Sequence, residues 1–389
     1  MEKSKLWTKD FITVTLVNFL AYLVYYLLMI IIAEYAMDSL SATPSQAGGA
    51  VGIFIIGALI ARLLTGGIIE RVGYKRMLFI GLAIYLVASL FYYGAHSLLL
   101  LMVVRFLHGV GFGSASVVTS TIAAQIIPVA RRGEGIGYYS LSTTMASAIG
   151  PMLGMFLVRQ LSFYAIVTVS IVLLVVAGIG AFILNIPKSH YTPDYEKSSI
   201  SIHHFLEMKA VPISLIGILL GVGYSSIVSF LTSYTSEIGL VAAGSFFFIV
   251  YSVAILFSRP VAGRLIDTKG ENFVMYPSFI SFTIGLFLMG IASNGVILLL
   301  SAVFIGAGFG TFLSSGQTIA IKVAPEHRVG LATSTFLAIV DAAVGIGPSI
   351  LGALVPIIGY NGVYVSMAVV ALVAGVLYFI FNKQILNKK

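Results

Sequence analysis

The chain of 389 residues is long enough for two or three soluble domains, but only 9% of its residues are charged and 59% are hydrophobic. Soluble domains carry about 25% charged residues, so this composition, with a mean hydropathy of +1.05, excludes a soluble globular protein and indicates a membrane protein. The absence of cysteine excludes disulfides and thiolate metal sites. The net charge of +8 comes from residues between apolar stretches, a pattern typical of membrane topology and not of a nucleic-acid-binding face.

A helix needs about 20 apolar residues to cross a bilayer, and the sequence contains twelve such stretches, six in each half. They are predicted at residues 11–33, 46–69, 77–95, 97–127, 135–158, 162–185, 210–236, 242–266, 273–293, 295–323, 329–356 and 361–382. The most polar segment, 186–209, separates the two sets and is predicted to be a cytoplasmic linker. We therefore expect an all-α membrane protein with an N-terminal six-helix bundle at 1–185 and a C-terminal one at 210–389.

The basic residues indicate how these helices are oriented. With the N-terminus in the cytoplasm, 18 of the 22 Lys and Arg residues fall on the cytoplasmic side, as the positive-inside rule requires. Lys3, Lys5 and Lys9 precede the first span, which has no small-residue cleavage site and is expected to remain uncleaved. We predict a multi-pass protein of the plasma membrane with both termini in the cytoplasm. Its partners are then the lipid bilayer, protons and a small-molecule substrate, with no nucleic acid, and the protein is expected to be a monomer.

The two halves of the chain are related by duplication. Residues 108–151 align without a gap with residues 305–348, and 14 of these 44 positions are identical. The same offset aligns Arg62 with Arg259. Because each half contributes six spans in the same orientation, we expect parallel repeats related by an axis along the membrane normal.

The loop after the second span contains a motif that continues this repeat. It comprises Gly66, Glu70, Arg71, Gly73, Lys75 and Arg76. This run resembles the loop signature of the major facilitator superfamily, G-x-x-x-D-R-x-G-[RK]-[RK], with Glu in place of Asp and Tyr74 in place of the first late basic residue. In the second half the acid is kept as Asp267, and Thr268 stands where the family has arginine.

Two further motifs resemble those of proton-coupled exporters in that superfamily. The run from Arg105 to Gly111 is similar to the R-x-x-x-G-x-G pattern of the fourth span in proton-coupled members. A second motif, similar to the G-P-x-x-G core of the antiporter motif, contains Gly150, Pro151 and Gly154, and its duplicate contains Gly347 and Pro348. The chain is identified as a member of the major facilitator superfamily, and it resembles the twelve-helix drug/proton antiporter branch.

The resemblance implies the major facilitator fold and transport by alternating access, with a proton gradient as the energy source and with no cofactor, metal or enzymatic activity. It implies that the loop motif, including Glu70 and Asp267, latches the two halves together by accepting hydrogen bonds from the amide groups at another helix's N-terminus. The alternative is that this cluster only fixes the topology and contacts anionic lipid. The Gly-Pro motifs are expected to bend their helices, and the first, fourth, seventh and tenth helices to line the substrate cavity.

Three residues are candidates for proton coupling. Asp341 lies about 18 Å along the eleventh span, deeper than any other acid, and its repeat counterpart is Thr144. Arg105 is a charge inside the fourth span, where charges are costly and usually functional. His108 lies three residues further on the same helical face, and imidazole exchanges protons in the physiological pH range. The sequence leaves open whether Asp341 or His108 carries the proton, and structural roles remain alternatives for all three.

The candidate substrate-binding residues lie on three of the four helices that the resemblance places around the cavity. Asn18, Tyr22 and Tyr25 share one face of the first span, with Tyr224 in the seventh and Gln317 in the tenth. Aromatic rings with hydroxyl groups suit an amphipathic ligand, although an aromatic stripe at helical spacing more often serves packing.

The sequence thus favours a proton-driven exporter of small amphipathic organic compounds. The alternative is proton-coupled transport of a specific polar metabolite, such as a sugar or a metal-chelating compound. A non-transporting membrane sensor or enzyme is a remote possibility, because the sequence shows no nucleophile–base pair, no metal-ligand spacing and no signalling domain.

Overall fold

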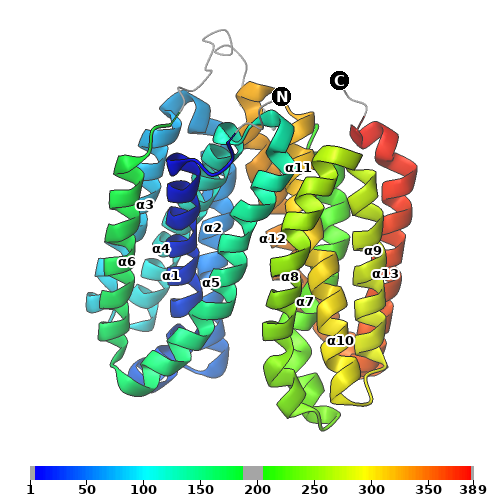
Figure 1. The fold of residues 1–389 in the computed structure, drawn as a ribbon. Coiled ribbons are helices and arrows are strands. Elements are labelled where there is room, and N and C mark those ends of the chain that lie inside the picture. Colours follow the sequence, from blue (N-terminus) through cyan, green and yellow to red (C-terminus); the bar gives the residue numbers. More distant parts are fainter. Residues whose placement is uncertain (1–4, 187–204, 387–389) are drawn as a thin grey trace. The chain divides into compact units, whose positions relative to one another are not determined.

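The computed structural model describes residues 5–186 and 205–386, so most of the predicted linker, residues 187–204, lies outside the described part. The described residues form helices and loops without a strand (Figure 1). The helices are α1 (Lys9–Leu40), α2 (Pro44–Val72), α3 (Tyr74–Phe91), α4 (Leu98–Ile126), α5 (Arg132–Gln160), α6 (Phe163–Ile183), α7 (Val211–Glu237), α8 (Val241–Lys269), α9 (Asn272–Gly290), α10 (Gly295–Ile305), α11 (Thr311–Val323), α12 (Val329–Gly352) and α13 (Val355–Leu386).

A π-helical segment, Gly306–Gly310, joins α10 to α11 without a break. In the described part of the chain, α10 and α11 therefore form a single membrane-length rod, and the rods number twelve, as the sequence predicts. Eleven of them are long and apolar enough to cross a membrane. The remaining one, α5, has 29 residues but is rich in Ser, Thr and Gly, and it corresponds to the predicted span 135–158.

The chain divides into two compact units. Unit 1 comprises Met1–Pro128, Ser142–Leu206 and Glu326–Ser334, and unit 2 comprises Val129–Leu141, Glu207–Pro325 and Thr335–Lys389. The first turns of α5 thus belong to unit 2, and the first turns of α12 belong to unit 1. Apart from these exchanged helix starts, each unit is built from the helices of one half of the sequence.

The packing inside unit 1 is repeated inside unit 2. In unit 1, α4 packs against α1, α2 and α3, and α6 packs against α1 and α3. In unit 2, the rod of α10 and α11 packs against α7, α8 and α9, and α13 packs against α7 and α9. The equivalence extends to single glycines, since a Cβ on Gly111 would meet the backbone of Tyr85, and one on Gly308 would meet that of Phe282. These pairs are all related by the offset of 197 residues.

The loop motif ends α2 and α8 in the same way. Gly73 and Gly270 follow these two helices with φ angles of +89° and +88°, a backbone region that glycine enters without the steric cost of a Cβ. Each glycine donates its amide hydrogen to a carbonyl four residues earlier, that of Ile69 or Ile266. The motif glycines are therefore required by the turn that starts the next helix.

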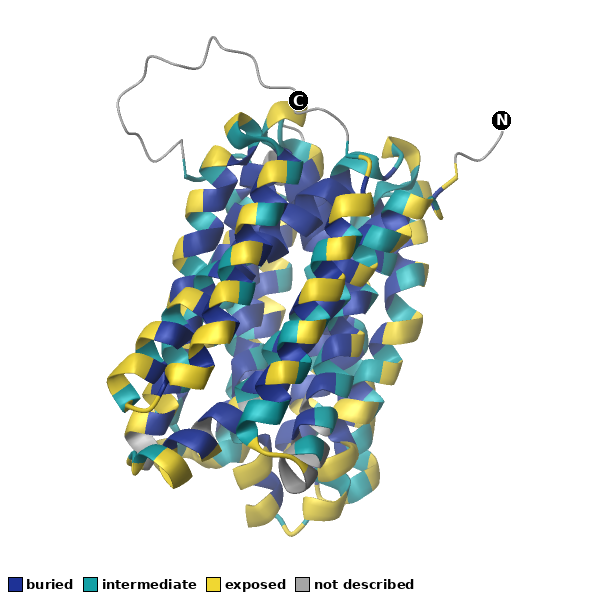
Figure 2. Ribbon diagram, turned by 90° about the vertical axis from the view of Figure 1, so that its left-hand side faces the viewer, coloured by how far each residue is buried: buried dark blue, intermediate teal, exposed yellow. Residues whose placement is uncertain are grey.

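Buried and exposed residues alternate along the helices (Figure 2), and many of the exposed residues are large and apolar. On α6 the exposed residues include Val172, Val175, Ile179 and Phe182, which recur every three or four residues and so form one face. A soluble protein rarely exposes such a continuous apolar face. These faces are suited to lipid.

Candidate functional site

The start of α5 is held in unit 2 by the acid of the second loop motif. The two carboxylate oxygens of Asp267 accept hydrogen bonds from the backbone amides of Gly133 and Glu134, both at 2.8 Å. These amides lie at the N-terminus of α5, where helical N–H groups have no partner within the helix. Gly263 allows this approach, because a Cβ there would lie 2.8 Å from the Cα of Glu134. This is the kind of contact expected of the loop motif, and it is made by its second copy.

Glu134 adds an ion-pair network to the same contact. Its carboxylate pairs with Arg131 at 2.8 Å and with Arg264 of α8 at 2.7 Å. The Glu134 side chain is 8% exposed, so the charged oxygens are largely removed from water and matched by two guanidinium groups. Sequence reasoning missed Glu134 and Arg264 because they are 130 residues apart and neither belongs to a recognised motif.

The first copy of the loop motif makes different contacts in unit 1. Glu70 accepts a hydrogen bond of 2.7 Å from the Tyr74 hydroxyl. Lys75 donates to the carbonyl oxygens of Phe182 and Leu184, at 3.0 and 2.8 Å, which neutralises the C-terminal end of α6. Arg71 and Arg76 are exposed.

Close packing between α2 and the start of α12 accompanies the first loop motif. A Cβ on Gly66 would collide with the side chain of Ser334, and one on Gly330 would lie 2.6 Å from Ile69. Gly66 and Gly330 are the repeat counterparts of Gly263 and Gly133. In each unit, therefore, two repeat-related glycines allow the start of one helix to pack closely against the helix that carries the loop motif: α12 against α2 in unit 1, and α5 against α8 in unit 2.

The Gly-Pro motifs also mark close helix contacts. A Cβ on Gly150 would lie 2.6 Å from Cβ of Tyr26 on α1, and one on Gly154 would lie 2.9 Å from the carbonyl oxygen of Leu27. In unit 2, Gly347 meets Ser225 of α7 in the corresponding way, and Pro348 lies inside α12. The side chain of Pro151 lies outside the described residues. The motif therefore joins α5 to α1 and α12 to α7 through small residues.

Each unit contains a stack of three aromatic rings. Phe54 and Phe112 correspond to Tyr251 and Phe309 at the offset of 197 residues, and Tyr25 corresponds to Tyr224 at the offset of 199 that aligns the first and seventh spans. In unit 1, Tyr25 stacks on Phe54 and on Phe112, with ring centroids 5.0 and 4.9 Å apart. In unit 2 the ring of Tyr224 lies 4.2 Å from Phe309 and 5.8 Å from Tyr251. Tyr22 adds an edge contact to Phe112 at 4.9 Å. Tyr22, Tyr25 and Tyr224 are all partly buried; Tyr25 and Tyr224 belong to the stacks, and Tyr22 contacts the stack of unit 1 edge-on.

Asn18 lies at a polar junction inside unit 1. It is 1% exposed, and its side-chain nitrogen donates to the hydroxyls of Ser142 and Thr143 on α5, at 2.8 and 3.2 Å. Its oxygen accepts from the hydroxyl of Thr119 on α4 at 3.1 Å. The residue thus joins three helices through a satisfied network, an arrangement that also stabilises the packing.

Arg105 and His108 lie together in unit 1, where both contact Phe54 of the aromatic stack. Both are 0% exposed. The Arg105 guanidinium donates to the carbonyl oxygen of Ala50 at 3.2 Å and to the Tyr92 hydroxyl at 3.4 Å, and it lies 4.5 Å above the ring of Phe54. His108 Nε2 lies 3.0 Å from the Ser89 hydroxyl, and the imidazole packs 5.2 Å from the Tyr92 ring. The structure therefore brings together two of the three predicted proton-coupling residues.

The third, Asp341, lies in unit 2. It occupies the middle of α12 and is partly buried. Its neighbours Val340 and Ala343 pack against Gly217 and Gly221 of α7, so Asp341 lies beside a tight helix–helix contact. Gln317 of α11 is 5% exposed. Its repeat counterpart Ser120, on α4, is 4% exposed.

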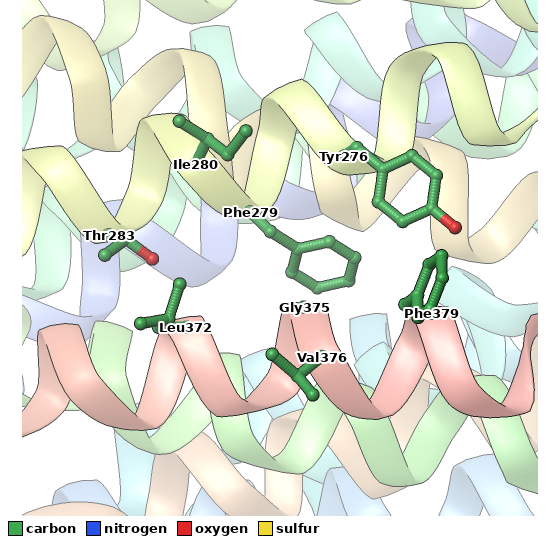
Figure 3. A pocket seen from close by; sticks show the side chains of 8 residues that line it. All are labelled: Tyr276, Phe279, Ile280, Thr283, Leu372, Gly375, Val376 and Phe379. Atoms are coloured by element: carbon green, nitrogen blue, oxygen red, sulfur yellow. The ribbon is translucent and has the colours of Figure 1, made fainter.

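A groove between α9 and α13 lies on the surface of unit 2 and encloses about 230 Å³ (Figure 3). Its lining is apolar except for the hydroxyl groups of Tyr276 and Thr283. Four of the lining side chains are more than half exposed, namely Ile280, Leu372, Val376 and Phe379. None of the predicted site residues lines this groove, and its chemistry is that of a lipid-facing surface.

Comparison with known proteins agrees with this architecture. The family model described as Major Facilitator Superfamily matches residues 14–280 and 238–388. An uncharacterised MFS-type transporter of Methanocaldococcus jannaschii is 23% identical over 385 residues, covering 96% of each chain. The staphylopine export protein of Staphylococcus aureus is 25% identical over 362 residues, covering 88% of each chain.

Among solved structures, the fucose:proton symporter of E. coli superposes with a TM-score of 0.78 at 14% identity, covering 97% of this chain and 99% of that one. The likeness shows the fold, two parallel six-helix repeats of transmembrane helices. These proteins are transporters and not enzymes. The chain belongs to the major facilitator superfamily and is a multi-pass secondary transporter.

Proposed function

We propose that the protein exports a small amphipathic organic compound in exchange for protons, by alternating access across the plasma membrane and with both termini in the cytoplasm. The observation that carries the proposal is Asp341, an acid in the middle of a membrane helix whose repeat counterpart is Thr144. A carboxyl group in the middle of a membrane helix is costly to keep charged. Such a group is suited to binding a proton on one side of the membrane and releasing it on the other.

Two further features support export of an amphipathic compound. The paired aromatic stacks, around Tyr25 and Tyr224, offer flat apolar surfaces with hydroxyl groups. The similarity to a protein described as an exporter of staphylopine extends over most of the chain. Arg105 and His108 complete the proposed coupling set, and Asn18, Tyr22 and Gln317 the proposed substrate-contacting set.

Flux measurements in proteoliposomes test this function. With an imposed proton gradient, amphipathic organic compounds are expected to move against the proton flow, and dissipating the gradient is expected to stop the movement. Movement of a compound in the same direction as protons would favour the alternative, proton-coupled uptake of a polar metabolite. A protein that moves neither protons nor solutes would contradict transport itself.

We infer that the two copies of the loop motif contribute unequally to the latch. In Asp267→Asn the amide nitrogen cannot accept a hydrogen bond from a backbone N–H, so one of the two charge-assisted bonds to α5 is lost and the other is weakened. Such bonds contribute about 1.5–3 kcal/mol each, and we expect transport to fall by about tenfold or more. Glu70→Gln keeps an oxygen to accept the Tyr74 hydroxyl, so its effect should be smaller.

Initial transport rates in proteoliposomes, normalised to protein content, measure this difference. Asp38→Asn is the matched control, because Asp38 is exposed at the end of α1. Equal rates for Asp267→Asn and Asp38→Asn would contradict the latch and leave the loop motif with a role in topology alone.

A further inference from the structure

Among the described residues of unit 1, none provides an anion to balance the buried positive charge of Arg105. Arg105 is 0% exposed, and its partners are a carbonyl oxygen, a phenol hydroxyl and an aromatic face. Within residues 5–186 and 205–386 it forms no ion pair, and its Nη2 has no hydrogen-bond partner. A guanidinium stays charged in proteins, and a buried charge is costly unless it is paired. An anion beside Nη2 would therefore be strongly favoured.

His108 presents a second polar atom without a partner, one helical turn away. Ser89 Oγ and His108 Nε2 lie 3.0 Å apart, and which of them donates depends on the tautomer of the imidazole. When the Ser89 hydroxyl donates its one proton to the carbonyl oxygen of Tyr85, 2.9 Å away, Nε2 is the donor in this contact. In the neutral imidazole this leaves Nδ1 as an acceptor. Among the described residues Nδ1 has no donor, although it is fully buried. The pair therefore offers one charged donor group and one acceptor.

The scaffold itself does not require this pair. At the repeat-equivalent positions of unit 2, Arg105 is replaced by Ala302 and His108 by Ile305. Their polar partners are replaced as well, Ser89 by Leu286 and Tyr92 by Met289. All four replacements are buried and apolar, yet the helices pack in the same way and the aromatic stack is kept. The polar cluster is thus an addition to unit 1 that packing alone does not explain.

We propose that Arg105 Nη2 and His108 Nδ1 form a binding site for the 2-hydroxycarboxylate end of an amphipathic organic acid. The carboxylate accepts from the guanidinium, and the 2-hydroxyl donates to Nδ1. The apolar body of the ligand lies against the ring of Phe54, which contacts both Arg105 and His108. Tyr25 and Phe112 pack on Phe54 and extend this aromatic surface. The inference rests on the proposed function and names its substrate class.

The donor and acceptor pattern distinguishes this ligand from simpler anions. Chloride would balance the guanidinium but leave Nδ1 without a donor. A 2-amino acid would bring an ammonium group beside Arg105, where two like charges repel in a medium of low dielectric constant. A 2-hydroxyl satisfies Nδ1 without adding charge.

Wild-type protein purified in detergent provides the first test, by titration calorimetry and thermal shift with compounds that share one apolar body. We expect 3-phenyllactate to bind at least about tenfold more tightly than 3-phenylpropionate, which lacks the hydroxyl, because a buried acceptor left unpaired is costly. 1-Phenyl-2-propanol, which lacks the carboxylate, should not bind measurably. The proposal would be overturned by equal binding of the two acids, by stabilisation with sodium chloride alone, or by no binding of any compound. The last result would mean that ordered water satisfies Arg105 Nη2 and His108 Nδ1.

Two variants assign the recognition to the named atoms. His108→Ile, which copies unit 2, is expected to remove the preference for 3-phenyllactate while keeping the weaker binding of 3-phenylpropionate. Arg105→Lys keeps the charge but loses the planar fork, and should weaken both acids by about tenfold or more. Thr283→Val, in the groove of unit 2, is the matched control and should bind like wild type. A His108→Ile protein that retains the preference would overturn the assignment.

The same compounds separate this inference from the proposed function. If 3-phenyllactate binds with the expected pattern but no proton-driven flux is found, the transport mode is wrong and the site stands. If other amphipathic compounds are exported against protons while neither acid binds, the site is wrong and the export function stands.

Discussion

Replacing Asp341 with asparagine is expected to abolish proton-driven transport while leaving the protein folded and inserted at wild-type levels. Asparagine has nearly the same size and can still form hydrogen bonds, but it cannot bind and release a proton. The tight contact with α7 is made by Val340 and Ala343, and both remain in the variant, so α12 should keep its packing. The loss should therefore concern coupling and not structure.

Two measurements in proteoliposomes distinguish these effects. Accumulation driven by a proton gradient should fall to background in Asp341→Asn, whereas exchange of labelled for unlabelled substrate without a gradient should persist. Glu237→Gln, at the exposed end of α7, is the control and should retain both activities. If Asp341→Asn still shows gradient-driven transport, another group carries the proton. Loss of gradient-driven transport in His108→Ile would then identify His108 as that group.

The second large effect is expected at the glycines of the loop motifs. Gly66→Ala places a Cβ against the side chain of Ser334, and Gly263→Ala places one against the backbone of Gly133 and Glu134. Overpacking of this kind typically costs about 1–3 kcal/mol. Both variants should unfold at a lower temperature, and both should lose transport because a helix start is forced away from its partner.

The two clashes differ in whether a second substitution can relieve them. Ser334→Gly removes the colliding atoms and should bring the free energy of unfolding of Gly66→Ala to within about 1 kcal/mol of wild type. The remaining difference is the cost of a glycine inside a helix. That substitution also copies unit 2, where the counterpart of Ser334 is Gly137. Gly263→Ala meets backbone, so trimming a side chain should not rescue it. Thermal unfolding curves of the single and double variants measure this, and an unaffected Gly263→Ala would contradict the packing.

Eleven of the twelve rods in the described part of the chain follow from hydrophobic length, and the helices differ from the predicted spans mainly at their ends. The first span was predicted to end at residue 33, but α1 continues to Leu40 and is capped by Ser41 in a left-handed conformation. The spans at 329–356 and 361–382 become α12, ending at Gly352, and α13, which has a break at Gly359 where φ is +68°. Lipid requires an apolar stretch of a certain length, but it does not determine where a polar cap ends a helix.

The candidate site was only partly accessible from the sequence. The mismatch between His108 and Ile305 is visible in the aligned repeat, because both residues lie in the duplicated stretch. Ser89 and Tyr92, which contact His108 and Arg105, lie outside that stretch, and only the folded helices bring them together. Helical periodicity placed Asn18 on the same face as Tyr22 and Tyr25, but it could not show that Asn18 is already bonded to Thr119. The predicted roles of these residues in binding and coupling remain predictions.

The exchange of helix starts between the two units has a consequence for biosynthesis. The amides of Gly133 and Glu134 find their partner Asp267 only after about 130 further residues have left the ribosome. Likewise Gln125 donates to the carbonyl oxygen of Glu326, 201 residues later, when the start of α12 completes unit 1. Neither unit can be finished while the nascent chain contains only the first six helices. During insertion the first turns of α5 therefore lack their final partner until α8 has been synthesised.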